Sequence, residues 1–409
     1  MRLDSDTLRE IADSLSRNRS RTFLTGFGIF WGLFMLLALI GGGRGFKEML
    51  MQNFTGFASN AAMMVSSNTS VPCKGLPEGR YWSMNLGDLD RIKAMVPGVD
   101  VVTPLQTIFN VKSEYGDRSY TGSLKGIRPD YASIEAPDMK YGRFINRVDI
   151  EQERKVCVLG KRVYEELFPD GGDPCGAFLK VGGVYYRVVG MNVSETNMSI
   201  NGRGSQSVLV PASVMQRIYN LGDAAEIVCL TAKPGVKVSE LEKRIRFVLG
   251  RRHSFDPEDD QALWYLNTEE MFSMMDSLFK GVNFLIWLIG LGTLLAGAIG
   301  VSNIMMVTVR ERTVEIGIRR AIGATPKDIL SQIMMESVIL TLLAGALGIM
   351  FSVLVLNVLE VATGNPVFQI DFWTAALSTA LLAVLGILAG LAPASRAMNI
   401  RAVDAMRDE

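Results

Sequence analysis

Four long segments without a charged side chain limit what this chain can fold into. They cover residues 22–43, 281–309, 337–359 and 372–395. The hydrocarbon core of a bilayer is roughly 30 Å thick, and a helix of about 20 apolar residues crosses it. Buried helices of soluble proteins seldom run that far without a charge. The sequence therefore predicts four membrane-spanning helices rather than one very hydrophobic soluble core.

The first apolar segment could instead be a cleaved signal peptide. Signal peptides have an apolar core of about 7–15 residues and a small-x-small cleavage site. The apolar core here is longer, and no such site follows in GGGRGFKEML, residues 41–50. We therefore interpret this segment as a retained span.

The distribution of lysine and arginine predicts the orientation, because cytoplasmic loops carry an excess of both. Basic residues gather before the first span, within residues 310–328 and after residue 395, whereas the loop 360–371 has none. We expect both termini and residues 310–328 in the cytoplasm and residues of about 46–280 outside. The expected location is the inner (cytoplasmic) membrane, with several spans and a large periplasmic domain.

The outer segment is too long for a connector, so we expect a domain with its own core. Strand-like and helix-like patterns alternate along it. Two β-rich runs flank Gly182 and Gly183, which indicates a hairpin. The predicted fold class is a polytopic α-helical membrane protein with four transmembrane helices and a large α+β extracytoplasmic domain, of two subdomains, inserted between helices one and two.

Apolar residues continue at helical spacing beyond the first span as far as Phe57, and they resume before the second span from Met271, with Thr268 as the expected N-cap. We interpret both as helical stalks; alternatively, they belong to the core of the outer domain.

The predicted divisions are a cytoplasmic amphipathic helix with Leu8, Ile11 and Leu15 on one face (1–21), first span plus stalk (22–57), extracytoplasmic domain (58–267), stalk plus second span (268–309), a basic segment (310–328), third span (329–359), extracytoplasmic loop (360–371), fourth span (372–395) and cytoplasmic tail (396–409).

Patterns for catalysis and for metal binding are missing. No G-x-x-x-x-G-K-[ST] loop occurs, and the single histidine, His253, lies in a segment typical of a solvated loop. One histidine nearly excludes a Ser-His-Asp triad or a multi-histidine metal site. Glu336 lies close to the membrane interface and indicates no ion path. We expect a non-catalytic chain without a bound cofactor or metal.

Charge and cysteine content add two expectations. The 42 basic and 42 acidic side chains balance, which argues against nucleic acid as a partner. Cys73, Cys157, Cys175 and Cys229 all fall in the outer domain, where disulfides are permitted and three pairings are open. We favour free thiols in packed strands, because a domain of this size does not need disulfides.

The basic segment, residues 310–328, reads RERTVEIGIRRAIGATPKD. A helix would place Val314, Ile318, Ala321 and Ile322 on one face and would pair Glu315 with Arg319, four residues on. In GATPKD we expect Gly323 to end that helix, Thr325 to cap the next, Pro326 to take its first position and Asp328 its third. Such a helix could lie on anionic lipid or dock on a cytoplasmic partner.

Three stretches carry a family resemblance. NIMMVTVRERTVEIGIRRAIGATPKDILSQIMMES (303–337), GLAPASRAMNIRAVDAMR (390–407) and NRSRTFLTGFGIFWGLFMLLALIGGGRG (18–45) resemble ABC-transporter permeases of the MacB/LolC/FtsX type. VLGKRVYEELFPDGGDPCGAFLKVGGVYYRVVGM (158–191) resembles the strand-rich part of their MacB-like extracytoplasmic domain. In that family the cytoplasmic helix fits a groove in an ATPase.

The resemblance implies site residues and partners. The ATPase-coupling residues would be Glu311, Arg312, Glu315, Ile316, Gly317, Ile318, Arg319, Arg320, Gly323 and Ala324. We expect two copies of an ABC ATPase on a separate chain, which would bind the ATP and Mg²⁺, and a second permease, as a homodimer more than a heterodimer. Gly292, Ala296 and Gly300 form a small-residue ridge that would pack either on that second permease or on a span of the same subunit.

The resemblance implies type VII-like export of amphiphilic substrates, such as drugs or peptides, from the periplasm by mechanotransmission. A periplasmic adaptor and an outer-membrane duct would be further partners. Alternatives are lipoprotein release, an FtsX-like signalling scaffold that controls a cell-wall hydrolase, and a membrane-tethered receptor that needs no ATPase.

Replacing both Glu315 and Arg319 with alanine should uncouple ATP hydrolysis from transport and leave membrane insertion intact. The reason is that these residues lie on the expected coupling helix. ATPase and transport assays on a reconstituted complex would measure this, and unchanged coupling would argue against the assignment.

Overall fold

The computed structural model describes residues 19–52, 54–194 and 200–398. It divides into two compact units, one of Met1–Met49 with Leu278–Glu409 and the other of Leu50–Ser277. The predicted helix over residues 1–21, with Leu8, Ile11 and Leu15, lies almost wholly outside the described residues, as does the tail after Met398.

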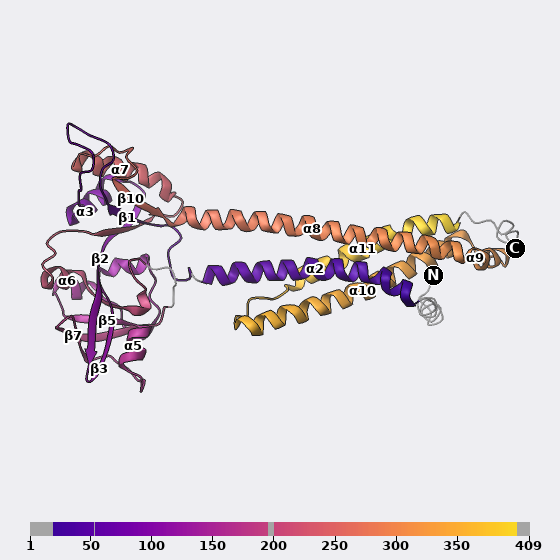
Figure 1. Ribbon diagram of the computed structural model, residues 1–409, viewed down its shortest axis with the longest axis horizontal. Coiled ribbons are helices and arrows are strands. Elements are labelled where there is room, and N and C mark those ends of the chain that lie inside the picture. Colours follow the sequence, from indigo (N-terminus) through magenta and orange to yellow (C-terminus); the bar gives the residue numbers. More distant parts are fainter. Residues whose placement is uncertain (1–18, 53, 195–199, 399–409) are drawn as a thin grey trace. The chain divides into compact units, whose positions relative to one another are not determined.

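The first unit is a bundle of long helices. They are α2 (Arg19–Gln52), α8 (Thr268–Glu311), α10 (Pro326–Thr363) and α11 (Phe372–Met398), with the short α9 (Thr313–Ala321) between α8 and α10. In the part of the chain that the structure describes, four helices are long and apolar enough to cross a membrane, which confirms the four predicted spans. Figure 1 shows the helices of this unit running alongside one another. A single buried cluster includes Leu33 of α2, Leu294 of α8, Ala344 of α10 and Leu382 of α11.

Helices α2 and α8 approach closely because glycine faces glycine. A Cβ added at Gly297 would lie 3.0 Å from the carbonyl oxygen of Gly28, which is tighter than nine in ten real Cβ contacts. Small residues allow backbones to approach in membranes, where packing drives association.

The second unit is an α+β domain on a ten-stranded sheet. Its strands are β1 (Ala61–Ser66), β2 (Val99–Tyr115), β3 (Arg118–Ile127), β4 (Met139–Gly142), β5 (Val156–Gly160), β6 (Phe178–Val181), β7 (Val184–Asn192), β8 (Ser207–Pro211), β9 (Ile227–Ala232) and β10 (Leu263–Asn267). Its helices are α3 (Leu86–Met95), α4 (Arg147–Glu151), α5 (Lys161–Leu167), α6 (Ala212–Ile218) and α7 (Val238–His253), with 3-10 turns η1 (Pro129–Ser133) and η2 (Gly204–Gln206).

The long strand β2 joins two subdomains. The strand order is β10-β1-β9-β2-β3-β8-β5-β7-β4, and β6 pairs with both β2 and β7. Residues 99–105 of β2 pair with β9. Residues 106–115 pair with β3, with an irregularity between Ile108 and Val111, and the end of β2 also pairs with β6. One core lies under β1, β9 and β10 with α3 and α7. A second core lies around β5 to β8 with α5 and α6. The predicted hairpin joins β6 to β7, and both Gly182 and Gly183 have positive φ as its turn requires.

Two helices, α2 and α8, contain residues of both units. The end of α2 and the start of α8 differ from the predicted residues. Helix α2 ends at Gln52 rather than at residue 57, because Gly56 adopts a φ of +87° and Phe57 is buried in the domain core. The N-cap of α8 is Asn267 rather than Thr268, since Asn267 Oδ1 accepts a hydrogen bond from the backbone N–H of Glu269 at 3.0 Å. Thr268 instead donates from Oγ1 to the carbonyl oxygen of Ala61 in the neighbouring strand, at 2.6 Å. Phe57 therefore belongs to the domain core, as the alternative interpretation held.

All four cysteines are free thiols, as expected. Cys157 and Cys229 are fully buried in β5 and β9, and burial raises the pKa of both thiols. Burial and the neighbouring Asp173 raise the pKa of Cys175 to about 11. Because these three stay protonated at neutral pH, they have the character of packing residues rather than nucleophiles.

The expectation that His253 lies in a solvated loop is wrong. It ends α7, and its ring packs on Trp82 with 4.7 Å between ring centroids. Its Nε2 lies 2.9 Å from Oδ2 of the buried Asp88, and the Nε of Arg252 lies 2.8 Å from Oδ1. Burial raises the pKa of Asp88, but hydrogen bonds from His253 and the Asn85 backbone, together with the Arg252 charge, lower it below its usual value. This carboxylate therefore ties α3 to the end of α7.

Asp88→Asn should lower the stability of this subdomain at pH 7 by about 1–2 kcal/mol, because it weakens the charge-assisted hydrogen bonds from His253 and from the partly exposed Arg252. A carboxylate with a lowered native pKa stabilises the fold above its unfolded pKa and stops doing so as pH falls through the native value. The difference between wild type and variant should therefore shrink towards pH 3. Amide hydrogen exchange of α3 and α7 in the full-length protein would measure it, with the exposed Asp90→Asn on the same helix as control. Equal exchange in Asp88→Asn and wild type at pH 7 would contradict this role.

Candidate functional site

The basic segment forms a corner between α8 and α10, and the sequence produces it locally. Backbone dihedrals leave helical geometry at Arg312, which caps α9, and at Gly323, whose φ is +111°. Helix α10 then begins with a capping box, in which the backbone N–H of Asp328 donates to Thr325 Oγ1 at 3.3 Å and the N–H of Thr325 donates to the Asp328 carboxylate at 3.1 Å. The predicted stop, cap and Pro326 start are all confirmed.

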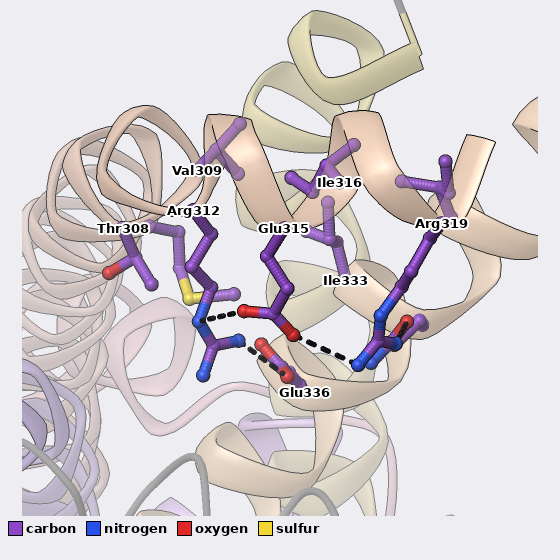
Figure 2. Close-up of a pocket in the computed structure, with 11 residues that line it drawn as sticks. Thr308, Val309, Arg312, Glu315, Ile316, Arg319, Ile333 and Glu336 are labelled. Atoms are coloured by element: carbon purple, nitrogen blue, oxygen red, sulfur yellow. Dashed lines mark hydrogen bonds and ion pairs between the residues drawn. The ribbon is translucent and has the colours of Figure 1, made fainter. Parts of the chain in front are cut away.

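Two arginines of the segment bind the neighbouring span. Arg312 Nη1 donates to Oε1 of Glu336 at 3.2 Å, and Glu336 is only 6% exposed on α10. Arg319 donates from Nη1 to Oε1 of Gln332 at 2.9 Å and from Nη2 to Oε1 of Glu315 at 2.9 Å, so the predicted Glu315–Arg319 pair is present and also reaches α10. Figure 2 shows Arg312 and Arg319 on either side of Glu315, with Glu336 beside Arg312. They line a cavity of about 30 Å³, room for a single water.

Two further contacts fix α9 against its own bundle. Ile316 is buried and packs in the same cluster as Ile329 and Ile333 of α10. Arg320 Nη1 donates to the carbonyl oxygen of Met398, at the end of α11, at 3.1 Å. The inner face of α9 thus carries both charged and apolar contacts to two spans.

The outer face of α9 is apolar. Val314, Ile318 and Ile322 are 51%, 47% and 82% exposed. Of the ten predicted coupling residues, Glu311, Glu315, Ile318 and Gly323 are exposed, Arg312, Arg319, Arg320 and Ala324 are half-buried, and Ile316 and Gly317 are buried. Only part of the predicted set is therefore presented outward.

Sequence reasoning missed Gln332 and Glu336. Both lie on α10, four residues apart, so they share one helix face. A glutamate directly before 23 uncharged residues was the available signal, but its partner Arg312 lies 24 residues earlier and belongs to another helix.

The predicted small-residue ridge is open. Gly292 and Ala296 are exposed and Gly300 is half-buried. Among the described residues, no atom lies within 4 Å of a Cβ position at Gly292 or Gly300. The contact of α8 with α2 uses Gly297 instead.

Comparisons with known proteins address the whole chain. The family model of the MacB-like periplasmic core domain matches residues 22–248, and that of the FtsX-like permease C-terminal domain matches residues 287–402. The macrolide export ATP-binding/permease protein MacB of Bdellovibrio bacteriovorus is 27% identical over 405 residues, which cover 97% of this chain and 60% of that protein. MacB of Escherichia coli K12 is 29% identical over 402 residues, 97% of this chain and 59% of that protein.

The chain thus spans about three fifths of the length of these relatives. The crystal structure of the periplasmic region of MacB from Actinobacillus actinomycetemcomitans superposes with a TM-score of 0.44 at 17% identity, over 56% of this chain and 98% of that one. The first family model alone covers more than half of the chain, and the second matches the spans from α8 onward. The chain therefore belongs to the MacB/FtsX-type family of ABC transporter permeases, with a MacB-like extracytoplasmic domain and an FtsX-like membrane domain.

Proposed function

We propose that this chain is the non-catalytic membrane component of a type VII-like ABC transporter, which exports amphiphilic molecules such as drugs or peptides from the periplasm by mechanotransmission. The observation that carries the proposal is the two-sided character of α9. Its inner side is fixed to α10 and α11, and its outer side presents Val314, Ile318 and Ile322. Exposed apolar residues beside a polar rim mark a protein contact.

The partner on that face is an ABC ATPase, present in two copies and holding ATP and Mg²⁺. The distribution of lysine and arginine supports a cytoplasmic position for α9 and both termini. The curated relatives are named ATP-binding/permease proteins, which supports ATP as the energy source. Their names also favour export over lipoprotein release and over signalling.

Helix α8 is the element that would carry motion from the membrane unit to the extracytoplasmic domain. It is one unbroken helix of 44 residues, about 66 Å long at 1.5 Å per residue. Its first turn is fixed in the domain, because Thr268 donates to Ala61 and the Glu269 carboxylate accepts a hydrogen bond from the backbone N–H of Val238 at 2.6 Å. A continuous helix held at its first residue transmits a displacement of its other end.

A second copy of this chain completes the proposed transporter. The ridge of Gly292, Ala296 and Gly300 is open on α8, which supports close packing of α8 against α8 of a homodimer partner. A periplasmic adaptor and an outer-membrane duct would complete the export route.

Changing Ile318 and Ile322 to serine should weaken ATPase binding by roughly tenfold or more, because each buried aliphatic side chain contributes about 1.5–3 kcal/mol. Val361→Ser, at an 85% exposed position near the other end of α10, is the matched control. Affinity purification in mild detergent, with mass spectrometry of the bound chains and lipids, would measure the retained ATPase. Equal retention in the Ile318/Ile322 variant and in wild type would refute the docking face, and absence of any ATPase from wild type would refute the proposed function.

Gly292→Leu combined with Gly300→Leu should shift the permease from dimer to monomer by roughly tenfold in the dissociation constant, because the added side chains separate the backbones. Native mass spectrometry from detergent would measure the two populations. Gly281→Leu, on the same helix with equally open surroundings, is the control. An unchanged dimer fraction in the double variant would place the dimer contact elsewhere.

A further inference from the structure

Glu336 is a carboxylate buried at the edge of a membrane span, where charged side chains are rare unless they have a function. It is 6% exposed and directly precedes the uncharged residues 337–359. Met305, Ile316 and Ile333 line the same small cavity. Because a buried charge is costly unless it is paired, the Arg312 guanidinium 3.2 Å away is required there.

The position of Arg312 in the backbone gives this pair a mechanical consequence. Arg312 is the residue at which the chain leaves α8 and enters α9, with a φ of −97° and a ψ of 16°. Gly323 interrupts the helix at the other end of α9. A nine-residue helix between two such breaks could swing relative to both spans. The side chain of Arg312 holds the first of these breaks against α10.

A second contact prevents rotation about the first. Arg319, two turns further along α9, reaches Gln332, one turn before Glu336 on α10. Glu315 lies between the arginines, 2.9 Å from Arg319 and 4.0 Å from Arg312. Figure 2 shows Arg312 and Arg319 reaching α10 on either side of Glu315. Two contacts at different points along α9 and α10 fix the orientation of one helix relative to the other, whereas a single contact would leave α9 free to rotate.

We propose that Glu336 is a positioning residue of the coupling mechanism: through Arg312 it locks α9 to α10, so that a displacement of α9 moves the third span together with α8. This inference rests on the proposed function, since α9 must be the element that the ATPase displaces. Glu336 is buried on α10, whereas Val314, Ile318 and Ile322 are exposed. Its effect is on transmission, while Val314, Ile318 and Ile322 provide the docking surface.

The lock itself can be tested without an ATPase. In full-length protein in detergent, Glu336→Gln should raise amide exchange of residues 313–321 by roughly tenfold or more, because hydrogen bonds to charged groups are the strong ones and local opening becomes easier. Exchange in the middle of α2 and in the sheet should not change, which shows that the fold persists. Glu360→Gln, near the opposite end of α10, is the matched control. Unchanged exchange of α9 in Glu336→Gln would overturn the lock.

Transmission is tested in the reconstituted complex of the permease with its ATPase. Glu336→Gln should leave ATPase binding within about twofold of wild type and reduce transport per ATP hydrolysed by roughly tenfold. The exchanged pair Arg312→Glu with Glu336→Arg should recover part of that loss and should restore slow exchange of α9. A merely structural role would lower binding and transport together.

The outcomes separate the two proposals. Loss of ATPase binding in Ile318/Ile322 variants with normal coupling in Glu336→Gln would support the proposed function and overturn the inference. A wild-type protein that binds no ATPase, although its α9 exchange depends on Glu336, would refute the proposed function and restrict Glu336 to a structural lock. If both Glu336→Gln and the exchanged pair fail to fold, Glu336 stabilises the bundle as a whole and the inference is likewise overturned.

Discussion

The exclusion of charge from hydrocarbon determines the arrangement of the membrane unit. A bilayer supplies neither hydrogen bonds nor a high dielectric constant, so charges either leave the core or are paired. The spans of this chain are uncharged along their centres, and the charged residues between α8 and α10 are concentrated in nineteen positions. Within that segment Arg312 and Arg319 find their partners on α10 rather than in solvent. The charged groups that are excluded from the membrane core thus hold the corner between α8 and α10 together.

This pairing reverses the usual amphipathic arrangement of α9. A surface helix normally turns its apolar side inward and its charges outward. Here Arg312 and Arg319 face the neighbouring span, and Val314, Ile318 and Ile322 lie on the outside. Ile316 alone supplies a buried apolar contact from the middle of the helix. An exposed apolar surface costs solubility, and a partner that covers it removes that cost. The charges that hold α9 in place thus leave these apolar residues exposed.

Sequence patterns confined to a few neighbouring residues led to the most accurate structural predictions. The spans, the break at Gly323, the Thr325 cap and the Glu315–Arg319 pair all depend on spacings of four residues or fewer, or on composition. Contacts between distant segments were missed: Glu336 binds an arginine 24 residues away, and β1 pairs with β9 and β10, more than 150 residues later. The strands β1 and β10 are also short and carry few β-branched residues, so their own sequences indicate a strand only weakly. At the start of α8, both Asn267 and Thr268 are N-cap residues by type, with asparagine somewhat preferred. The hydroxyl of Thr268 is taken by the neighbouring strand, and Asn267 forms the cap.

Helix α10 packs closely against α2 in the bundle. A Cβ at Gly348 would lie 3.0 Å from the carbonyl oxygen of Phe30 in α2, and the ring of Phe351 packs edge-on against Phe34 with 4.9 Å between centroids. Helix α2 in turn contacts α8 through Gly28 and Gly297. Close-packed contacts of this kind transmit displacement instead of absorbing it. A push on α9 would therefore reach α8 through the chain and α10 through Glu336, and α2 would receive it from both. The first turn of α8 is itself fixed to β1 and α7, which supports the proposed transmission to the extracytoplasmic domain.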